Sequence, residues 1–243
     1  MRIGYSAREG GFRGGQVIDL TRDEVYNLCL DELQGVDDGY SNDKPLIIWG
    51  APGVGSKTSI MKQLIKAYNE TQTDNKNKKS LITIDCGSLT LDDFFVPSII
   101  QNDDGTGQST DLIKTWLPVW KPVRGDKEKT ALLAKNANEY EQDDGIVTGN
   151  GGVIFFDELF RANDDVFKVV VNLAVNRTFT GGSFLIALTG GYVLGDKWTI
   201  ILGSSRPFDD SEVKKNYISH LSAAFLDRFT HVCLVPDAKD LDE

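Results

Sequence analysis

Residues 49–60, WGAPGVGSKTSI, combine closely spaced glycines with a lysine and a threonine, and this combination suits the binding of phosphate groups. Glycine allows backbone N–H groups to converge on phosphate oxygens, and a lysine side chain can reach the terminal phosphates. The usual pattern is G-x-x-x-x-G-K-[ST], in which the last glycine adjoins the lysine. Here Ser56 stands between Gly55 and Lys57. The sequence therefore predicts a nucleotide-binding loop that departs from the usual pattern at one position.

Two alignments of this loop are open. A nine-residue loop can begin at Gly50 and carry Ser56 as one inserted residue, or an eight-residue loop can begin at Ala51 with Ser56 in place of the last glycine. Both alignments share one set of candidate nucleotide-binding residues. They are Gly50, Ala51, Pro52, Gly53, Val54, Gly55, Ser56, Lys57, Thr58 and Ser59.

A pair of carboxylates follows about 100 residues later. Residues 153–158 read VIFFDE, so Asp157 and Glu158 come directly after four apolar residues. Neighbouring side chains at a strand end point in different directions, so one carboxylate can face a metal shell and the other a water near the last phosphate. A magnesium ion bound with a triphosphate needs a hydroxyl and a nearby carboxylate. The two motifs together indicate a nucleoside triphosphate site with Mg²⁺.

The elements that must hold these residues follow from the apolar pattern. Residues 45–49, PLIIW, are a short apolar run typical of a strand buried on both faces, and 58–69 has apolar residues at helical spacing. Thr21 and Glu24 match a capping box, which marks the start of a helix. The expected strands are 45–49, 81–85, 153–156, 198–202 and 230–235, and the expected helices are 21–34, 58–69, 127–141, 164–175 and 220–226. This alternation predicts an α/β fold with a mainly parallel, five-stranded sheet.

The remaining segments complete the expected organisation. Residues 1–17, rich in glycine and arginine, are expected to be a flexible tail, 18–236 the α/β core, and 237–243 (DAKDLDE) an acidic C-terminal tail. Residues 86–126 are expected to be irregular, and the glycine-punctuated stretch 178–197 predicts a hairpin.

Composition narrows the class of protein. Of 243 residues, 40% are hydrophobic and 26% charged, as in an ordinary globular chain, and no apolar run approaches the roughly 20 residues that span a bilayer. The N-terminus has no apolar secretory stretch, so we expect an intracellular, cytoplasmic protein. Three widely spaced cysteines indicate reduced core thiols. The net charge of −10 disfavours a mainly electrostatic grip on nucleic acid.

In their order along the chain, these motifs resemble AAA+ ATPases of the MoxR type. The resemblance covers residues 40–236. It is carried by 50–58, by GVIFFDELFRA at 152–162, by SSRP at 204–207, by LSAAFLDRF at 221–229 and by WLP at 116–118. It implies a P-loop NTPase fold, a three-layer αβα sandwich corresponding to the AAA+ large subdomain. It also favours the loop alignment that begins at Gly50, because the loop glycines then keep their family positions.

The resemblance implies a role for each matching residue. Lys57 would contact the β- and γ-phosphates of ATP, and Thr58 would bind Mg²⁺ together with Asp157. Glu158 would polarise the attacking water. Arg228 would serve as the arginine finger acting on the nucleotide of a neighbouring subunit, where an extra cation stabilises the charge of the transition state.

Three positions depart from the family pattern. Ser56 alters the loop, Ser205 occupies the catalytic sensor position that is commonly asparagine, and Phe160 stands where asparagine is common. A serine hydroxyl can still bond water or phosphate, but with a shorter reach. These changes predict slow hydrolysis, or binding without turnover, more than a changed fold. The small helical lid of AAA+ proteins is expected to be missing from this chain, either as a truncation or as a lidless form.

The sequence therefore favours an ATP- and Mg²⁺-dependent ATPase core in a homo-oligomeric, hexameric ring that remodels a partner protein, with a von Willebrand A-type protein as one conceivable partner. A nucleotide-binding scaffold with weak or no hydrolysis is the main alternative. A DNA-linked motor is a third, disfavoured by the acidic charge.

Overall fold

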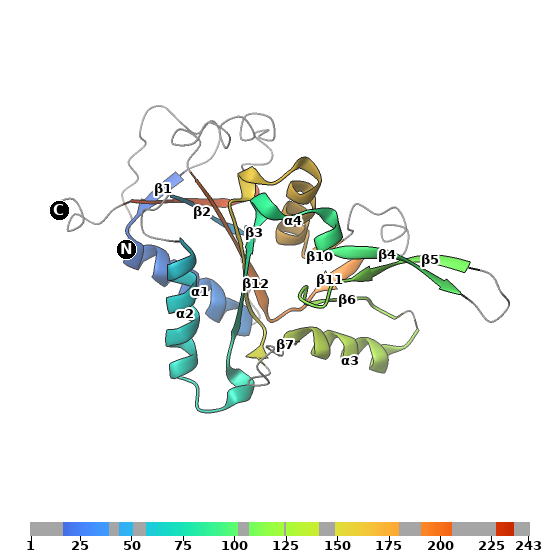
Figure 1. The fold of residues 1–243 in the computed structure, drawn as a ribbon. Helices are drawn as coiled ribbons and strands as arrows, with labels where there is room; N and C mark the ends of the chain where they lie inside the picture. Colours follow the sequence, from blue (N-terminus) through green and yellow to red (C-terminus); the bar gives the residue numbers. More distant parts are fainter. Residues whose placement is uncertain are drawn as a thin grey trace.

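A parallel β-sheet forms the centre of the molecule (Figure 1). The computed structural model describes residues 17–38, 44–50, 57–101, 107–123, 125–140, 149–179, 191–205 and 227–235. The six strands are ordered β1-β13-β2-β12-β9-β3, and every neighbouring pair is parallel. They are β1 (Val17–Leu20), β2 (Leu46–Gly50), β3 (Ser80–Asp85), β9 (Gly152–Asp157), β12 (Trp198–Ser205) and β13 (Thr230–Leu234). The predicted α/β class with a mainly parallel sheet is confirmed.

Helices cover both faces of this sheet. The helices α1 (Arg22–Asp37) and α2 (Lys57–Glu70) pack on one face, and α4 (Asp164–Asn176) packs on the other. Strand β2 shows the alternation: Leu46 and Ile48 belong to the α1–α2 side of the core, whereas Ile47 and Trp49 belong to the α4 side. A strand buried on both faces must be apolar throughout, which explains the PLIIW run.

Helix α1 starts where its capping box predicts. The Thr21 backbone N–H donates to Glu24 Oε2 at 2.8 Å, and the Glu24 N–H donates to Thr21 Oγ1 at 3.4 Å. The Thr21 backbone and side-chain hydrogen bonds lower the pKa of Glu24. The helix runs three residues beyond its predicted end at residue 34, to Asp37.

Among the described residues, the central sheet has six strands, one more than the predicted five. Strand β1 pairs with β13 at the edge, with Val17 opposite His231. An edge strand is paired on one side only, so a four-residue segment that exposes Asp19 is sufficient there. Val17, expected to end the N-terminal tail, is thus the first residue of β1; residues 1–16 and 236–243 lie outside the described residues.

The segment predicted to be irregular contains a projecting hairpin, so that prediction was wrong. Strands β4 (Phe95–Gln101) and β5 (Gly107–Ile113) pair antiparallel along their length. Strand β4 contains Pro97 and β5 is largely polar, so neither has the apolar pattern of a core strand. A hairpin outside the central sheet does not require that pattern.

A smaller sheet lies beside the hairpin and the helix α3 (Lys127–Asn138). It contains β10 (Thr178–Phe179), β11 (Tyr192–Leu194) and β6 (Val119–Trp120), in that order. The antiparallel pairing of β10 with β11 confirms the two ends of the predicted 178–197 hairpin, and residues 180–190 lie outside the described part. Helix α3 ends at Asn138 because β7 (Glu139–Tyr140) follows and pairs with β8 (Gly149–Asn150).

The expected helix at 220–226 falls on residues that are not described. Cys29, Cys86 and Cys233 are all buried and none is joined in a disulfide, as predicted for core thiols. In the described part of the chain, no helix combines the length and apolarity needed to cross a bilayer.

Candidate functional site

Residues from four strands, three of them polar, meet at the carboxyl edge of the central sheet. Because the strands are parallel, their carboxyl ends lie together: Ser205 of β12 pairs with Gly50 of β2, and Asp85 of β3 pairs with Asp157 of β9. This is the edge at which ligands bind in open α/β sheets. Helix α2 begins here too, with Lys57 as its first residue.

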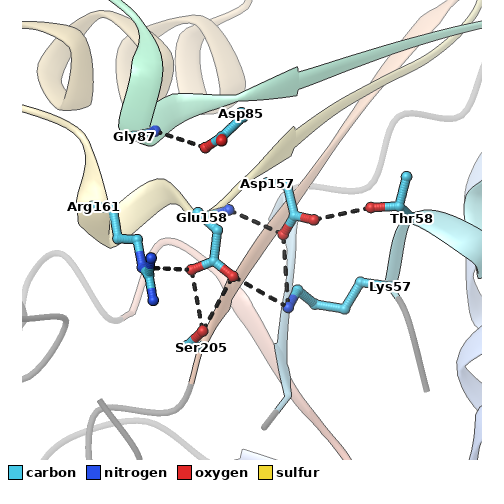
Figure 2. A network of polar contacts seen from close by, with 8 residues as sticks. All are labelled: Lys57, Thr58, Asp85, Gly87, Asp157, Glu158, Arg161 and Ser205. Atoms are coloured by element: carbon cyan, nitrogen blue, oxygen red, sulfur yellow. Dashed lines mark hydrogen bonds and ion pairs between the residues drawn. The ribbon is translucent and has the colours of Figure 1, made fainter. Parts of the chain in front are cut away.

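Lys57 lies between two carboxylates. Its side-chain Nζ is 3.7 Å from Asp157 Oδ1 and 3.8 Å from Glu158 Oε1, and the residue is only 7% exposed. A buried ammonium group is stable only when it is paired, and these carboxylates supply the pairing. The adjacent Thr58 Oγ1 donates to Asp157 Oδ2 at 3.0 Å. Lysine, threonine and aspartate thus form one contact network (Figure 2).

The backbone turns sharply at Glu158. Its φ of 51° and ψ of 42° place it in the left-handed region, which residues other than glycine seldom adopt. The Glu158 N–H donates to Asp157 Oδ1 at 3.0 Å, which stabilises this turn. The 3₁₀ helix η4 (Leu159–Arg161) follows directly. The turn separates the two carboxylates, so that Asp157 faces Thr58 whereas Glu158 faces Ser205 and Arg161.

The Glu158 carboxylate has partners on both oxygens. Ser205 Oγ lies 3.1 Å from Oε1 and 3.1 Å from Oε2, and Arg161 Nε lies 3.4 Å from Oε2. With Lys57, two cations and a hydroxyl surround this one carboxylate. Its position is fixed from three sides.

A glycine in β12 leaves room for Asp157. A Cβ at Gly203 would lie 2.8 Å from Asp157 Oδ1 and 2.7 Å from Phe155 Cζ, closer than atoms pack. Any larger residue at 203 would displace the carboxylate or the ring.

The structure brings together six of the predicted site residues: Gly50, Lys57, Thr58, Asp157, Glu158 and Ser205. Ser59 Oγ instead accepts a hydrogen bond from Arg22 of α1 at 3.1 Å, and so links the two helices. The predicted loop residues Ala51, Pro52, Gly53, Val54, Gly55 and Ser56 lie outside the described residues.

Arg228 lies apart from this cluster. It is exposed and precedes β13, whose first residue, Thr230, pairs with Leu46 at the amino end of β2. The cluster is at the opposite, carboxyl edge. Within the described part of the chain, Arg228 makes no ion pair with Asp227, the local pairing that would otherwise explain it.

Sequence reasoning assigned no role to Asp85, Arg161 or Gly203. Asp85 ends the predicted strand 81–85, where its Oδ1 accepts from the Gly87 N–H at 3.0 Å. Arg161 is three residues after Glu158, a spacing that predicts contact in a helical turn. Nothing in the sequence marks Gly203, because its importance arises only from the register between β12 and β9.

The donor set suits a phosphate ligand with a hard metal ion. Thr58 and Asp157 offer two neighbouring oxygens, as a magnesium ion that is also held by phosphates and water requires. Across the residues with described positions, no group of three or more His, Cys, Asp or Glu side chains could hold a metal ion alone. The oxygens of Thr58 and Asp157 therefore fit Mg²⁺ that arrives with a nucleotide better than a resident metal.

The one cysteine next to the described cluster is poorly suited to act as a nucleophile. Cys86 adjoins the site, but burial raises the pKa of its thiol, and the negative charges of Asp85, Asp157 and Glu158 raise it further. Both effects disfavour the thiolate, which is the nucleophilic form of cysteine.

The sequence model of one protein family, described as "AAA domain (dynein-related subfamily)", matches residues 45–229. This range includes every residue of the cluster. No match to a curated protein was found.

Proposed function

Since the chain belongs to the dynein-related subfamily of AAA domains, we propose that it is a MoxR-type ATPase that binds ATP with Mg²⁺ and hydrolyses it at the carboxyl edge of its sheet. The observation that carries this proposal is the position of Lys57 Nζ, within 3.8 Å of both Asp157 and Glu158. A phosphate group placed there would meet a cation at the start of a helix, where backbone N–H groups also favour anions.

Each residue of the cluster has a chemical task in this proposal. Lys57 exchanges its carboxylate contacts for phosphate oxygens. Thr58 and Asp157 would hold Mg²⁺, which, when bound, neutralises charge on the phosphates. Glu158 orients the attacking water and accepts its proton, while Ser205 and Arg161 fix the direction of that carboxylate.

Hydrolysis and binding of ATP by three variants test this proposal. Glu158→Gln should lower kcat by about 100-fold or more while ATP still binds, because the base is lost and the lysine remains. Lys57→Ala should weaken ATP binding by about tenfold or more, because a charged contact is lost. Lys66→Ala is the matched control, since Lys66 lies on the same helix and is exposed. Parent-level hydrolysis in Glu158→Gln would refute the assigned site.

A second candidate is a nucleotide-binding scaffold with little hydrolysis. It is favoured by the contacts of Glu158: each of its oxygens lies near a cation, and the Ser205 hydroxyl lies 3.1 Å from both and can donate to one of them. A carboxylate so engaged is less available to a water. This candidate predicts that the parent binds ATP and that Lys57→Ala abolishes this binding. It also predicts that the parent hydrolyses ATP no faster than Glu158→Gln does. The two results together would establish it.

We extend the proposal to assembly and location. AAA domains typically form rings, so a homo-oligomeric, hexameric ring in the cytoplasm that remodels a partner protein is the setting we propose. A von Willebrand A-type protein is one candidate partner. The segment between β10 and β11 is a candidate contact on the ring face.

A further inference from the structure

Helix α3 has apolar residues that the fold does not bury. Five of its twelve residues are alanine or leucine, yet Asn138 is the one residue of the helix that is buried, and Leu132 is 57% exposed. A helix of about 12 residues is marginal in water and usually depends on packing of an apolar face. The unburied face of α3 is therefore a candidate contact surface.

The two ends of α3 are nevertheless fixed. At the start, the Asp126 side chain caps the helix by accepting from the Lys129 N–H at 2.8 Å. At the end, Asn138 Oδ1 accepts from the Lys197 N–H at 3.0 Å, and Trp198 Nε1 donates to the Ala137 carbonyl at 2.9 Å. These contacts hold the helix against the start of β12, at the edge of the sheet opposite the nucleotide site. The exposed face is thus held in a defined position.

A groove runs between α3 and the small sheet. It has a volume of about 420 Å³, and we call it the α3 groove. Apolar and aromatic side chains make up much of its lining, among them Ile113, Leu117, Trp120, Leu133 and Tyr192. Asn136 of α3 also lines the groove. Leu132 lies one helical turn before Asn136, so this exposed leucine lies on the same side of the helix, next to the groove. The groove has room for one or two large apolar side chains.

The charged side chains that line the groove are two lysines and one glutamate. The glutamate, Glu139, is paired with Lys135, whose Nζ lies 3.4 Å from Glu139 Oε1. The lysines are Lys114 and Lys121, and Lys121 Nζ lies 5.8 Å from the centre of the Tyr192 ring. Such a surface is complementary to an acidic partner.

We propose that the α3 groove docks an acidic segment of a partner protein, with one or two leucine-like side chains in the groove and carboxylates against Lys114 and Lys121. A protein is favoured over a nucleic acid because the lining is mainly apolar and because the chain as a whole repels a phosphate backbone. The proposal goes beyond the ATPase activity and does not depend on it.

The test measures fluorescence anisotropy of a labelled peptide in which two leucines are flanked by aspartates and glutamates. The full chain should bind it, and the variant Lys114→Glu/Lys121→Glu should bind at least about tenfold more weakly, because two attractive contacts become repulsive. The matched control is Lys62→Glu/Lys66→Glu, which changes the net charge equally on exposed positions of α2 and should alter binding less than twofold. Leu132→Ser should weaken binding by a few fold.

Three further binding measurements distinguish an acidic peptide from other ligands of the α3 groove. The same peptide with serine in place of leucine should bind at least fivefold more weakly, and single-stranded oligothymidine should not compete. Lys57→Ala should bind the peptide like the parent, which separates this proposal from the nucleotide site. No peptide binding at millimolar concentration, equal binding of the serine peptide, or competition by oligothymidine would each overturn it. Self-association that is abolished by Lys114→Glu/Lys121→Glu would assign the groove to a second copy instead.

Discussion

Among single residues, Glu158 has the most constrained side chain of the site. Its backbone is in the left-handed region, and its carboxylate contacts Lys57, Arg161 and Ser205. Strained backbone of this kind persists only where the surrounding structure holds it. Of the three partners, the Ser205 hydroxyl lies equally close to both oxygens, at 3.1 Å, and can donate its one proton to either of them.

Removal of the Ser205 hydroxyl should slow hydrolysis. A hydrogen bond of about 1–1.5 kcal/mol that positions the base corresponds to about tenfold in rate. We expect Ser205→Ala to lower kcat for ATP by about that factor and to leave KM nearly unchanged, because Lys57 and Thr58 remain. Steady-state phosphate release measures both constants.

The adjacent serine provides the control for this change. Ser204 Oγ is buried and has no hydrogen-bond partner among the described residues, so Ser204→Ala should leave kcat within about twofold of the parent. Faster hydrolysis in Ser205→Ala would mean that Ser205 restrains Glu158 rather than positions it.

At the level of elements, a polar network joins α1, α2 and β3 near the amino edge of the sheet. Asp37 at the end of α1 accepts from Tyr68 Oη at 2.7 Å and forms an ion pair with the buried Lys79. Asn69 fixes the same place by bonding the Lys79 backbone N–H and carbonyl at 2.7 and 2.9 Å. Burial lowers the pKa of Lys79, and the Asp37 pairing opposes this effect.

The Tyr68 phenol makes the stability of this junction dependent on pH. Burial and the hydrogen bond to Asp37 raise the pKa of Tyr68 from 10.0 to about 12, with further contributions from the charges of Asp37 and Asp38. The folded chain therefore keeps the Tyr68 proton at a pH at which the unfolded chain loses it. This contribution to the free energy of unfolding is complete below pH 10 and is lost as the pH rises through about 12.

Urea unfolding at pH 9 and pH 11.5 measures this contribution. At pH 9, Tyr68→Phe should be less stable than the parent by about 1 kcal/mol, a value reduced for the partial exposure of the ring. At pH 11.5 the difference should shrink, because the parent has lost part of the contribution. Tyr26→Phe, from the neighbouring part of α1, controls for the lost hydroxyl. A difference that stays constant with pH would contradict the assignment.

The elements also show what a sequence can predict. The strands with uniform apolar runs, such as β2 and β9, were predicted within one or two residues, because burial on both faces leaves a strong signal. The sequence singled out Lys57 and Thr58 through the glycine–lysine motif, and Asp157 and Glu158 through the paired carboxylates after an apolar run. The structure brings these four side chains together. Strands β4 and β5 were missed because they lie outside the central sheet and join the core only at their base, through Phe95 and Ile113. Arg161 was missed although its three-residue spacing from Glu158 is one at which side chains meet in a helical turn, whereas Gly203 was missed because its contacts depend on strand register.

On the scale of the whole molecule, the central sheet separates two groups of candidate functional residues. The nucleotide cluster lies at the carboxyl edge, and Arg228 lies near the amino end of β13. Strand β2 alone spans five residues between these edges, so the sheet stands between Arg228 and the cluster of its own chain. If Arg228 assists hydrolysis, it must do so at the site of a neighbouring subunit.

Mixing two inactive variants tests this arrangement. Arg228→Ala subunits keep a complete nucleotide cluster but lack the arginine, and Lys57→Ala subunits lack the lysine but keep Arg228. Each variant alone should hydrolyse ATP slowly. In a head-to-tail ring assembled from an equal mixture, about a quarter of the sites join an intact cluster to an intact arginine, so hydrolysis should recover to about a quarter of the parent rate. Recovery should disappear when Arg228→Ala is mixed with the double variant Lys57→Ala/Arg228→Ala, which has no arginine to donate. A mixture no more active than its components would show that Arg228 does not act across a subunit boundary, and its exposure would then need another explanation.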